Sequence, residues 1–442
     1  MDSQNKHNPI ELFLQHKSLR FRLFWEGIAV GIGTGLIISL FRFVLVSGEA
    51  LRVQVYDIVL ADRMLFIPYV LFFLVTAWLL LRLMKMEPIC SGGGVPQVKG
   101  LLAGSMSMNW WLALICRFVG CCLSIGAGMS MGRAGPSVHL GACVGKGFSS
   151  NRKRSRTEER ILITAGAGAG LAAAFSAPLA GVIFCLEELH KTFSPVVLTA
   201  AIGASVMAVS ICQAFFGFNM MFTIGELERV TLGMLPVFFL MALFVGFWAL
   251  AFNRGLILSM DIYNNSSFLK GRKPLLPLFL AAVLGFVLPE ILGGGNELVD
   301  YMVKNPYPMA FLLTVLAGKY LYTMICCGSG VPGGIFLPML VLGALGGNLF
   351  GQLAILIGIM PEEFLPHTIV FGMAAYFAAV AKSPVTAAVL IMEITGSTHY
   401  MLTLVMVSMT AYMVADMAGG KPIYEQLLEY SLNKKGSVTT NG

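Results

Sequence analysis

Charged residues are scarce in this sequence: Asp, Glu, Lys and Arg make up 12% of 442 residues. Soluble domains contain about 25%, so the composition excludes an ordinary soluble protein. Hydrophobic residues reach 57%, mean hydropathy is +0.79, and most apolar runs are long enough to cross a bilayer as a helix. The short alternating segments typical of a β-barrel are lacking. We therefore expect an all-α polytopic membrane protein.

The nine cysteines lack the spacing of a metal or disulfide framework. Their number is odd, no C-x-x-C occurs, and two adjacent pairs lie inside apolar runs, at 121–122 and 326–327. Buried free thiols are the expectation, with neither a disulfide framework nor a metal site. The sequence also has no H-E-x-x-H motif and no Cys/His cluster, which argues against a metal-dependent enzyme embedded in the membrane.

The net charge of +7 does not indicate a nucleic-acid partner, because the basic residues lie in short loops between apolar runs. The densest group falls at 146–160, and the positive-inside rule places that loop in the cytoplasm. Residues 1–22 contain Lys17, Arg20 and Arg22 and have no cleavable apolar region. We expect them to form a helix on the cytoplasmic membrane surface rather than a signal peptide.

Two stretches repeat the pattern G-x-x-x-P-x-x-x-L-G-A-x-x-G, at 132–145 and 334–347. In each, a glycine turn precedes a proline, which the first turn of a helix tolerates because its N–H has no partner there. Such a helix start presents free amides and partial positive charge, and is a ready anion site. A third glycine start followed by proline lies at 92–96. Three such starts, if they converge, would bind an anion without a full positive charge and still release it.

A second pair of similar stretches, at 175–188 and 382–393, occurs in the same order and at nearly the same separation. We interpret the chain as two halves of a duplicated unit. Gly and Pro break several apolar segments, which is tolerated at membrane depth where the backbone lines a cavity and favours a transport site. The expected layout is a single membrane domain at 1–442, with a first repeat at about 23–216, a polar stretch at 223–229, a second repeat at about 230–424, and a short cytoplasmic tail at 425–442.

Four motifs resemble the CLC family of chloride channels and chloride/proton exchangers, whose patterns are G-S-G-x-P, G-R-E-G-P, G-x-F-x-P and a late G-K-P-x-Y. This sequence has G-G-G-V-P at 92–96, G-R-A-G-P at 132–136, G-I-F-L-P at 334–338 and G-K-P-I-Y at 420–424. The resemblance extends over nearly the whole chain. It implies an inverted repeat of two halves with broken and re-entrant helices, and a homodimer with one pore per subunit. It also implies a prokaryotic plasma (inner) membrane protein with both termini in the cytoplasm and without cytoplasmic regulatory domains.

The resemblance implies the following anion-binding residues: Gly93, Arg133, Ala134, Gly135, Ile335, Phe336 and Tyr424. The backbone N–H groups of Ile335 and Phe336 and the hydroxyl of Tyr424 would hold a central anion. The amides around Ala134 would line an outer position. Bound chloride ions and membrane lipids are expected, with no other cofactor.

Ala134 stands where the exchangers of the family carry a glutamate that gates the outer site and moves protons. A methyl group can neither block the site electrostatically nor titrate. A natural channel-like protein and an engineered Glu→Ala substitution both remain open. Glu188 matches the inner proton-transfer glutamate of the family, and a carboxyl in an apolar segment needs a reason to be there. A hydrogen-bonded structural carboxyl is its alternative role, which we expect for Glu187 and Glu393.

Gly93 stands where the family usually has serine. Glycine keeps the backbone N–H but lacks the hydroxyl donor of serine. A well-placed hydroxyl discriminates between anions by their hydration cost and geometry. Chloride is the expected anion, and nitrate, bromide and fluoride stay open. His139 is expected to be packed or hydrogen-bonded, with proton transfer as its alternative. Arg117 and Lys319 would pair with glutamate, contact backbone carbonyls or line an anion path.

The residues and the resemblance together predict passive, anion-selective conduction through a CLC-type fold, uncoupled from protons because of Ala134. The first alternative is chloride/proton antiport, by an unmodified parent or through another titratable group. A membrane-embedded enzyme would need a nucleophile with its base, or a metal cluster. A cation-coupled carrier is disfavoured, because helix-start amides favour anions whereas cations prefer carbonyl-rich helix ends.

Overall fold

The computed structural model describes residues 9–439, except 219–220, 223, 226–228, 268 and 270, and describes no side chains at 9–17 and 434–439. The described residues form helices and no β-strand. A single isolated bridge joins Gly132 to Gly334. The all-α fold predicted from composition is therefore confirmed.

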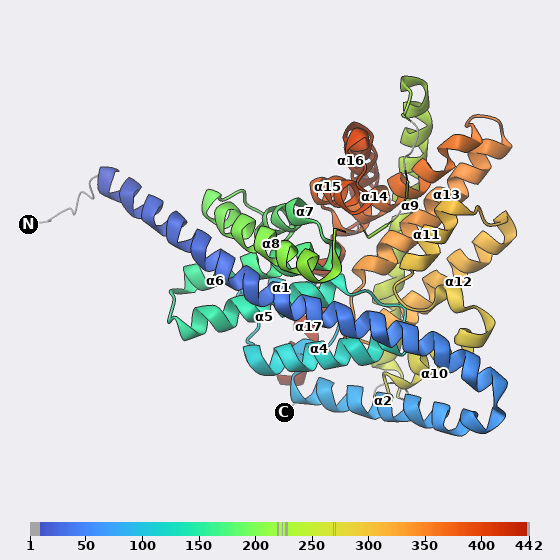
Figure 1. The fold of residues 1–442 in the computed structure, drawn as a ribbon, viewed down its shortest axis with the longest axis horizontal. Helices are drawn as coiled ribbons and strands as arrows, with labels where there is room; N and C mark the ends of the chain where they lie inside the picture. Colours follow the sequence, from blue (N-terminus) through green and yellow to red (C-terminus); the bar gives the residue numbers. More distant parts are fainter. Residues whose placement is uncertain are drawn as a thin grey trace, which may run out of the picture.

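Helices of the first half lie on the left and along the bottom of Figure 1, and those of the second half lie mainly on the right. The first half contains α1 (Pro9–Ala61), α2 (Phe66–Met86), α3 (Val95–Leu102), α4 (Trp110–Gly126), α5 (Ala134–Asn151), α6 (Arg156–Phe175), α7 (Pro178–Phe184) and α8 (Pro195–Phe216). The second half contains α9 (Leu235–Asn265), α10 (Leu275–Val287), α11 (Asn296–Lys304), α12 (Met309–Gly328), α13 (Phe336–Leu356), α14 (Leu365–Ala381), α15 (Pro384–Thr395), α16 (Met401–Met417) and α17 (Ile423–Thr439).

Short helical turns connect several of these helices. The 3₁₀ turns are η1 (Arg63–Leu65), η2 (Pro88–Cys90), η4 (Leu232–Met234), η5 (Pro289–Ile291), η6 (Glu362–Phe364) and η7 (Thr398–Tyr400). A π-helical turn, η3 (Cys185–His190), follows α7 directly. Turns of the π type are rare overall, and those that occur often lie at functional sites.

Eight helices in the described part of the chain are long and apolar enough to cross a membrane, judged by length and composition. The apolar helices α4, α10 and α15 are shorter, with 17, 13 and 12 residues, whereas a span takes about 20. The prediction of a multi-span protein with broken helices is confirmed.

The first helix differs from the expected layout. Residues 9–22 are the beginning of α1, which continues without a break for 53 residues, rather than a separate helix. No proline follows Pro9 within α1, so nothing removes an internal hydrogen bond and stops the helix. Residues 1–8 and part of the polar stretch at 223–229 lie outside the described residues. The surface position of the first turns stays a prediction.

In each half, small residues let one pair of helices pack in close contact, and the two pairs occupy equivalent positions. A Cβ built on Gly141 of α5 would lie 2.0 Å from the carbonyl oxygen of Gly166 on α6. In the second half, a Cβ on Gly343 of α13 would lie 2.6 Å from the carbonyl oxygen of Gly372 on α14. Such close backbone approach between membrane helices requires small residues at the crossing. Glycines at matching positions of the repeated pattern therefore do the same packing task.

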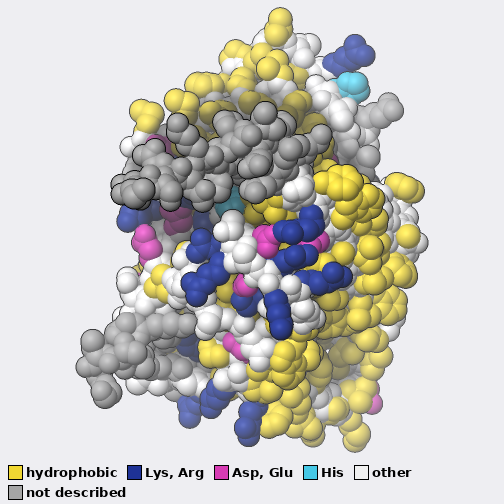
Figure 2. All heavy atoms as spheres, turned by 90° about the vertical axis from the view of Figure 1, so that its left-hand side faces the viewer, with side chains coloured by type: hydrophobic (Ala, Val, Ile, Leu, Met, Phe, Trp, Pro, Cys, Tyr) yellow, Lys and Arg dark blue, Asp and Glu magenta, His cyan; other side chains and the backbone are white. Residues whose placement is uncertain are grey.

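Lys and Arg side chains gather on the face that lies to the left in Figure 1, where the loop between α5 and α6 is found (Figure 2). Lys146 pairs there with Glu159 at 2.6 Å, and Arg154 pairs with Glu26. Hydrophobic side chains border this face along one side in Figure 2. The basic loop predicted to be cytoplasmic thus belongs to one charged end of the molecule.

Candidate functional site

The three glycine-rich helix starts meet in the interior. The N–H of Gly132 donates to the carbonyl of Gly334 at 2.7 Å, and the N–H of Gly334 donates back at 2.9 Å. The N–H of Gly92 donates to the carbonyl of Gly330 at 2.9 Å. These bonds join the loops that lead into α3, α5 and α13. Segments far apart in the sequence are therefore held together by backbone alone.

Gly135 lies at the point where the three loops touch. A Cβ built there would lie 2.2 Å from the carbonyl oxygen of Gly93 and 3.3 Å from the Cα of Gly334. Both approaches are closer than ordinary van der Waals contact, so any larger residue would push the loops apart. Glycine at 135 is required by this packing.

Two of the helix starts leave amide donors available. Arg133 precedes α5 and Ile335 precedes α13, and neither side chain bonds the first amides of its helix. The first N–H groups of a helix have no partner inside the helix, and their dipoles favour an anion. At the start of α3 the arrangement differs, because Gln97 Oε1 accepts from the N–H of Gly94 at 2.8 Å. That amide is already engaged.

Tyr424 stands at the beginning of α17 and is 1% exposed. Its hydroxyl has no hydrogen-bond partner among the described residues, although a buried phenol O–H normally has one. Phe336, the first residue of α13, is packed between the rings of Phe377 and Phe175, with centroids at 4.5 and 5.3 Å. The aromatic packing fixes the start of α13. The anion-binding roles of these residues stay predictions.

A cavity of about 600 Å³ opens beside two of the predicted site residues, Gly93 and Ile335. Its polar lining includes Asn264 at the end of α9, Lys273 in the loop after α9, and Tyr430 in the middle of α17. A volume of this size falls within the range of small-molecule sites. The cavity therefore lies next to the first and third helix starts.

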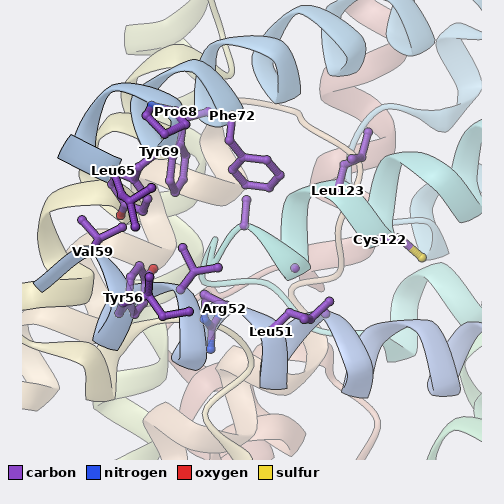
Figure 3. A pocket seen from close by; sticks show the side chains of 16 residues that line it. Leu51, Arg52, Tyr56, Val59, Leu65, Pro68, Tyr69, Phe72, Cys122 and Leu123 are labelled. Atoms are coloured by element: carbon purple, nitrogen blue, oxygen red, sulfur yellow. The ribbon is translucent and has the colours of Figure 1, made fainter. Parts of the chain in front are cut away.

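A second cavity, of about 530 Å³, lies between α1, α2 and α4 (Figure 3). Tyr56 comes from α1, Tyr69 and Phe72 from α2, and Leu123 from α4 (Figure 3). Apart from Arg52 its lining is almost entirely apolar, and none of the predicted site residues contributes to it. This crevice is therefore separate from the candidate site.

Glu188, in η3, is buried with 3% exposure. Its Oε1 accepts from Lys99 Nζ at 2.7 Å, and its Oε2 accepts from Ser383 Oγ at 2.5 Å. Lys99, on α3, is buried as well. Removing one partner of such a pair would leave an uncompensated charge in the core. The sequence indicates Glu188 but not Lys99, because the two lie 89 residues apart and no local pattern links them.

The structure gives hydrogen-bond partners to the three polar residues for which the sequence left alternative roles, Arg117, His139 and Lys319. Arg117 donates to the carbonyl of Gly92 at 2.5 Å and to Nδ1 of His139 at 2.8 Å. His139 is thus hydrogen-bonded, as expected, and Arg117 braces the first glycine loop. Lys319 donates to the carbonyl of Gly293 at 2.8 Å. Both cations contact backbone carbonyls, and neither has a carboxylate partner within ion-pair distance among the described residues.

Residues 128–132 match the hydrolase pattern G-x-S-x-G, which marks a nucleophile when the serine meets a histidine. Ser130 instead shares a hydrogen bond of 2.8 Å with the hydroxyl of Thr323. A hydroxyl is no general base, so Ser130 is a packed structural serine. Within the described ranges, no group of three His, Cys, Asp or Glu side chains could hold a metal ion.

Helix α5 has no carboxyl at its first residue. Ala134 opens α5 and is fully buried, and Nε of the preceding Arg133 has no partner among the described residues. Glu49 on α1 lies within electrostatic reach of Arg133 and Lys319. The start of α5 therefore has free amides next to the basic Arg133, and Glu49, which itself lies within electrostatic reach of Glu297, is set back from it.

Comparisons with known proteins agree on the family and on the fold. A family model described as voltage gated chloride channel matches residues 71–416. The H(+)/Cl(-) exchange transporter ClcA of Vibrio cholerae is 31% identical over 96% of this chain and 93% of its own length. The same transporter of Vibrio vulnificus is 32% identical over 96% of this chain and 93% of its own.

Solved structures give the same picture. The crystal structure of a slow cyanobacterial Cl⁻/H⁺ antiporter matches this chain with 31% identity and a TM-score of 0.87. The match covers 94% of this chain and 99% of the antiporter chain. A CLC-type fluoride/proton antiporter, which is 20% identical, shares the fold over 93% of this chain and 97% of that chain with a TM-score of 0.74.

The prediction of passive conduction uncoupled from protons is wrong. The relatives of known sequence are named H(+)/Cl(-) exchange transporters, and the similar solved structure at 31% identity is a Cl⁻/H⁺ antiporter. That prediction rested on one missing carboxyl, at Ala134, although Glu188 keeps a second titratable group in the same core. The relatives are transporters rather than enzymes. The chain, matched by the family model over most of its length, belongs to the voltage-gated chloride channel family, also called CLC.

Proposed function

We propose that this protein exchanges chloride for protons across the membrane. The observation that carries the proposal is the position of Glu188, a buried carboxyl held by Lys99 and Ser383. It also lies within electrostatic reach of Tyr424. An ionisable residue inside a membrane protein is costly and marks ion or proton pathways. The exchange activity named for the relatives supports the same function.

The anion route of the proposal follows the helix starts. A central chloride ion accepts from the N–H groups of Ile335 and Phe336 and from the hydroxyl of Tyr424. A second position lies at the amides around Ala134 and Gly135. Partial charges of about half a unit at each helix start attract an anion without trapping it, whereas a buried ammonium would hold it more strongly.

Chloride is the proposed anion, and Gly93 decides how strictly it is selected. The glycine borders the inner cavity of about 600 Å³ and offers one N–H without a hydroxyl. Nitrate, bromide and fluoride are the competing ions to be compared in the same transport assay. A single donor fewer costs an anion about 1.5–3 kcal/mol of interaction at most, so the order of preference depends on hydration as well.

The outer proton step needs a group other than Ala134. Glu49 is the carboxylate within electrostatic reach of Arg133, next to the start of α5. In this proposal, protons leave Glu188 through water and reach the outside past Glu49. Replacing Glu49 with glutamine would then slow proton movement more than chloride movement.

Transport by the purified full-length protein in proteoliposomes tests the proposal. With high internal chloride, chloride efflux is recorded together with external pH, and liposomes without protein give the leak. Exchange predicts that the external medium becomes alkaline as chloride leaves, and that Glu188→Gln removes the pH change. Chloride efflux with no pH change in the parent protein would refute proton coupling. No chloride movement would redirect the assay to the other anions.

We also propose a homodimer in a prokaryotic plasma membrane, with both termini in the cytoplasm. Large apolar side chains are exposed on α7, α8, α15 and α16, namely Leu179, Ile202, Val206, Val385, Val405, Met409 and Met413. These helices belong to both halves, and we propose that a second copy of the chain packs against their exposed apolar side chains. The basic residues at the end seen in Figure 2 support a cytoplasmic orientation of that face.

A further inference from the structure

Lys99 lies between two carboxylates of different burial. Its Nζ is 2.7 Å from Oε1 of Glu188 and 3.7 Å from Oε1 of Glu425. Glu188 is 3% exposed, whereas Glu425 is 35% exposed and also pairs with Lys191. The charges thus alternate from the core toward the surface, and Lys99 is the link between the buried carboxylate and the accessible one.

The second carboxylate belongs to the helix that carries the predicted anion ligand. Glu425 follows Tyr424 directly at the beginning of α17. Helix α3 packs against α17 through Gly100, where a Cβ would lie 2.9 Å from a methyl carbon of Leu428. A change in the Lys99 ion pairs therefore acts on the same helix turn as the phenol of Tyr424.

We propose that Lys99 is a positioning residue for proton–anion exchange, which holds Glu188 as a carboxylate and turns to Glu425 when Glu188 takes up a proton. The inference rests on the exchange function proposed above. The proton comes from cytoplasmic water and binds a carboxylate oxygen of Glu188, while Lys99 keeps its own charge. No covalent bond other than that O–H forms.

The sign of each effect follows from the charges around Glu188. Burial disfavours the ionised form of Glu188, whereas Lys99 on α3, the hydroxyl of Ser383 and Lys191 beyond η3 favour it. Glu425 on α17 competes for Lys99 and favours the protonated form. Removing Lys99 should therefore let Glu188 keep its proton to higher pH, and removing the charge of Glu425 should do the reverse.

The test is the pH dependence of exchange in proteoliposomes, measured as the proton flux and the chloride-to-proton ratio. Lys99→Met is expected to move the pH of half-maximal proton flux upward by about one to three units. Lys99→Arg should restore the parent profile, because it keeps the charge. Glu425→Gln should move the profile downward. A lysine with a merely structural role would not shift the profile in opposite directions in these variants.

Lys146→Met is the matched control, since it removes another lysine–glutamate pair, at 2.6 Å to Glu159, on a different pair of helices. It should leave the profile and the ratio unchanged. If Lys99→Met does not fold, Lys99→Gln tests the same prediction, because it also removes the charge while keeping a polar side chain, and it should likewise move the profile upward.

The outcomes separate the two proposals. No proton flux in the parent protein would overturn the exchange function itself. Proton flux in the parent with an unchanged profile in both Lys99→Met and Glu425→Gln would overturn only the role of Lys99. Opposite shifts in the two variants would establish it.

Discussion

Glu187 and Glu393 cap each other's helices across the two halves of the chain. Glu393 of α15 accepts from the N–H of Ala180, in the first turn of α7, at 2.7 Å. Glu187, which follows α7, accepts from the N–H of Thr386, in the first turn of α15, at 2.6 Å. A carboxylate at a helix start satisfies free amides and complements the dipole. The expectation that both are hydrogen-bonded structural carboxyls is confirmed.

Breaking one of these caps should destabilise the protein. Glu393→Ala leaves the first amides of α7 without their charged acceptor, which costs about 1–3 kcal/mol. We expect a lower midpoint in thermal unfolding of the detergent-solubilised protein. Glu363→Ala, at an exposed position of η6, is the control and should leave the midpoint unchanged. Equal midpoints for both variants would contradict a capping role.

Adding the missing hydroxyl at the inner helix start should change anion preference. A Cβ on Gly93 would meet only Pro96 Cδ, at 3.9 Å, so Gly93→Ser fits without strain. We expect a higher ratio of chloride to nitrate flux, because the hydroxyl supplies one more directed donor. Gly94→Ser is the contrasting variant: its φ is +97° and a Cβ would lie 2.3 Å from the carbonyl oxygen of Gly135. It should disrupt folding. An unchanged flux ratio in Gly93→Ser would count against Gly93 as an anion contact.

A carboxylate at the outer helix start should make chloride movement depend on pH. In Ala134→Glu, the ionised side chain competes with chloride for the amides at the start of α5. We therefore expect slower chloride flux at neutral pH and faster flux as the pH falls and the carboxyl is protonated. Flux measured from pH 7 to below the usual carboxyl range, about 4, checks this. A pH-independent flux identical to the parent would place the anion path elsewhere.

Removing the phenol of Tyr424 should weaken chloride binding. A hydrogen bond to a charged group contributes about 1.5–3 kcal/mol, so Tyr424→Phe should lower the affinity for chloride about ten-fold or more in a calorimetric titration. Tyr376 on α14 is also fully buried with no hydroxyl partner among the described residues. Tyr376→Phe is the matched control and should bind chloride as the parent does. Equal loss in both variants would mean a general packing effect.

The parts of the site built from backbone were predictable from the sequence. The glycine and proline pattern predicted helix starts near 95, 134 and 336, and the repetition at 132–145 and 334–347 indicated that two of these starts belong together. The structure brings them into contact through Gly132, Gly135 and Gly334. Such patterns can be recognised in the sequence because the glycine and proline of each motif lie within a few residues of each other.

The parts of the site built from side-chain pairs were not predictable. Lys99 sits in an apolar stretch with no nearby acid in the sequence, and its partner Glu188 is reached only through the packing of α3 against η3. The unbroken α1 was also missed, because a change from polar to apolar residues does not end a helix when no proline intervenes. Function was misjudged for a different reason: the missing carboxyl at Ala134 was given more weight than the carboxyl that the chain keeps at Glu188.

The paired glycines at 132 and 334 also bear on how the pathway can move. Each half contributes one glycine to this pair of backbone hydrogen bonds, so neither half can form the contact alone. Widening it would mean breaking two backbone hydrogen bonds in a buried setting, which is a steep cost. If the anion path runs past these loops, as proposed, we expect side chains and the first turn of α17 to move during transport while Gly132 and Gly334 stay hydrogen-bonded to each other.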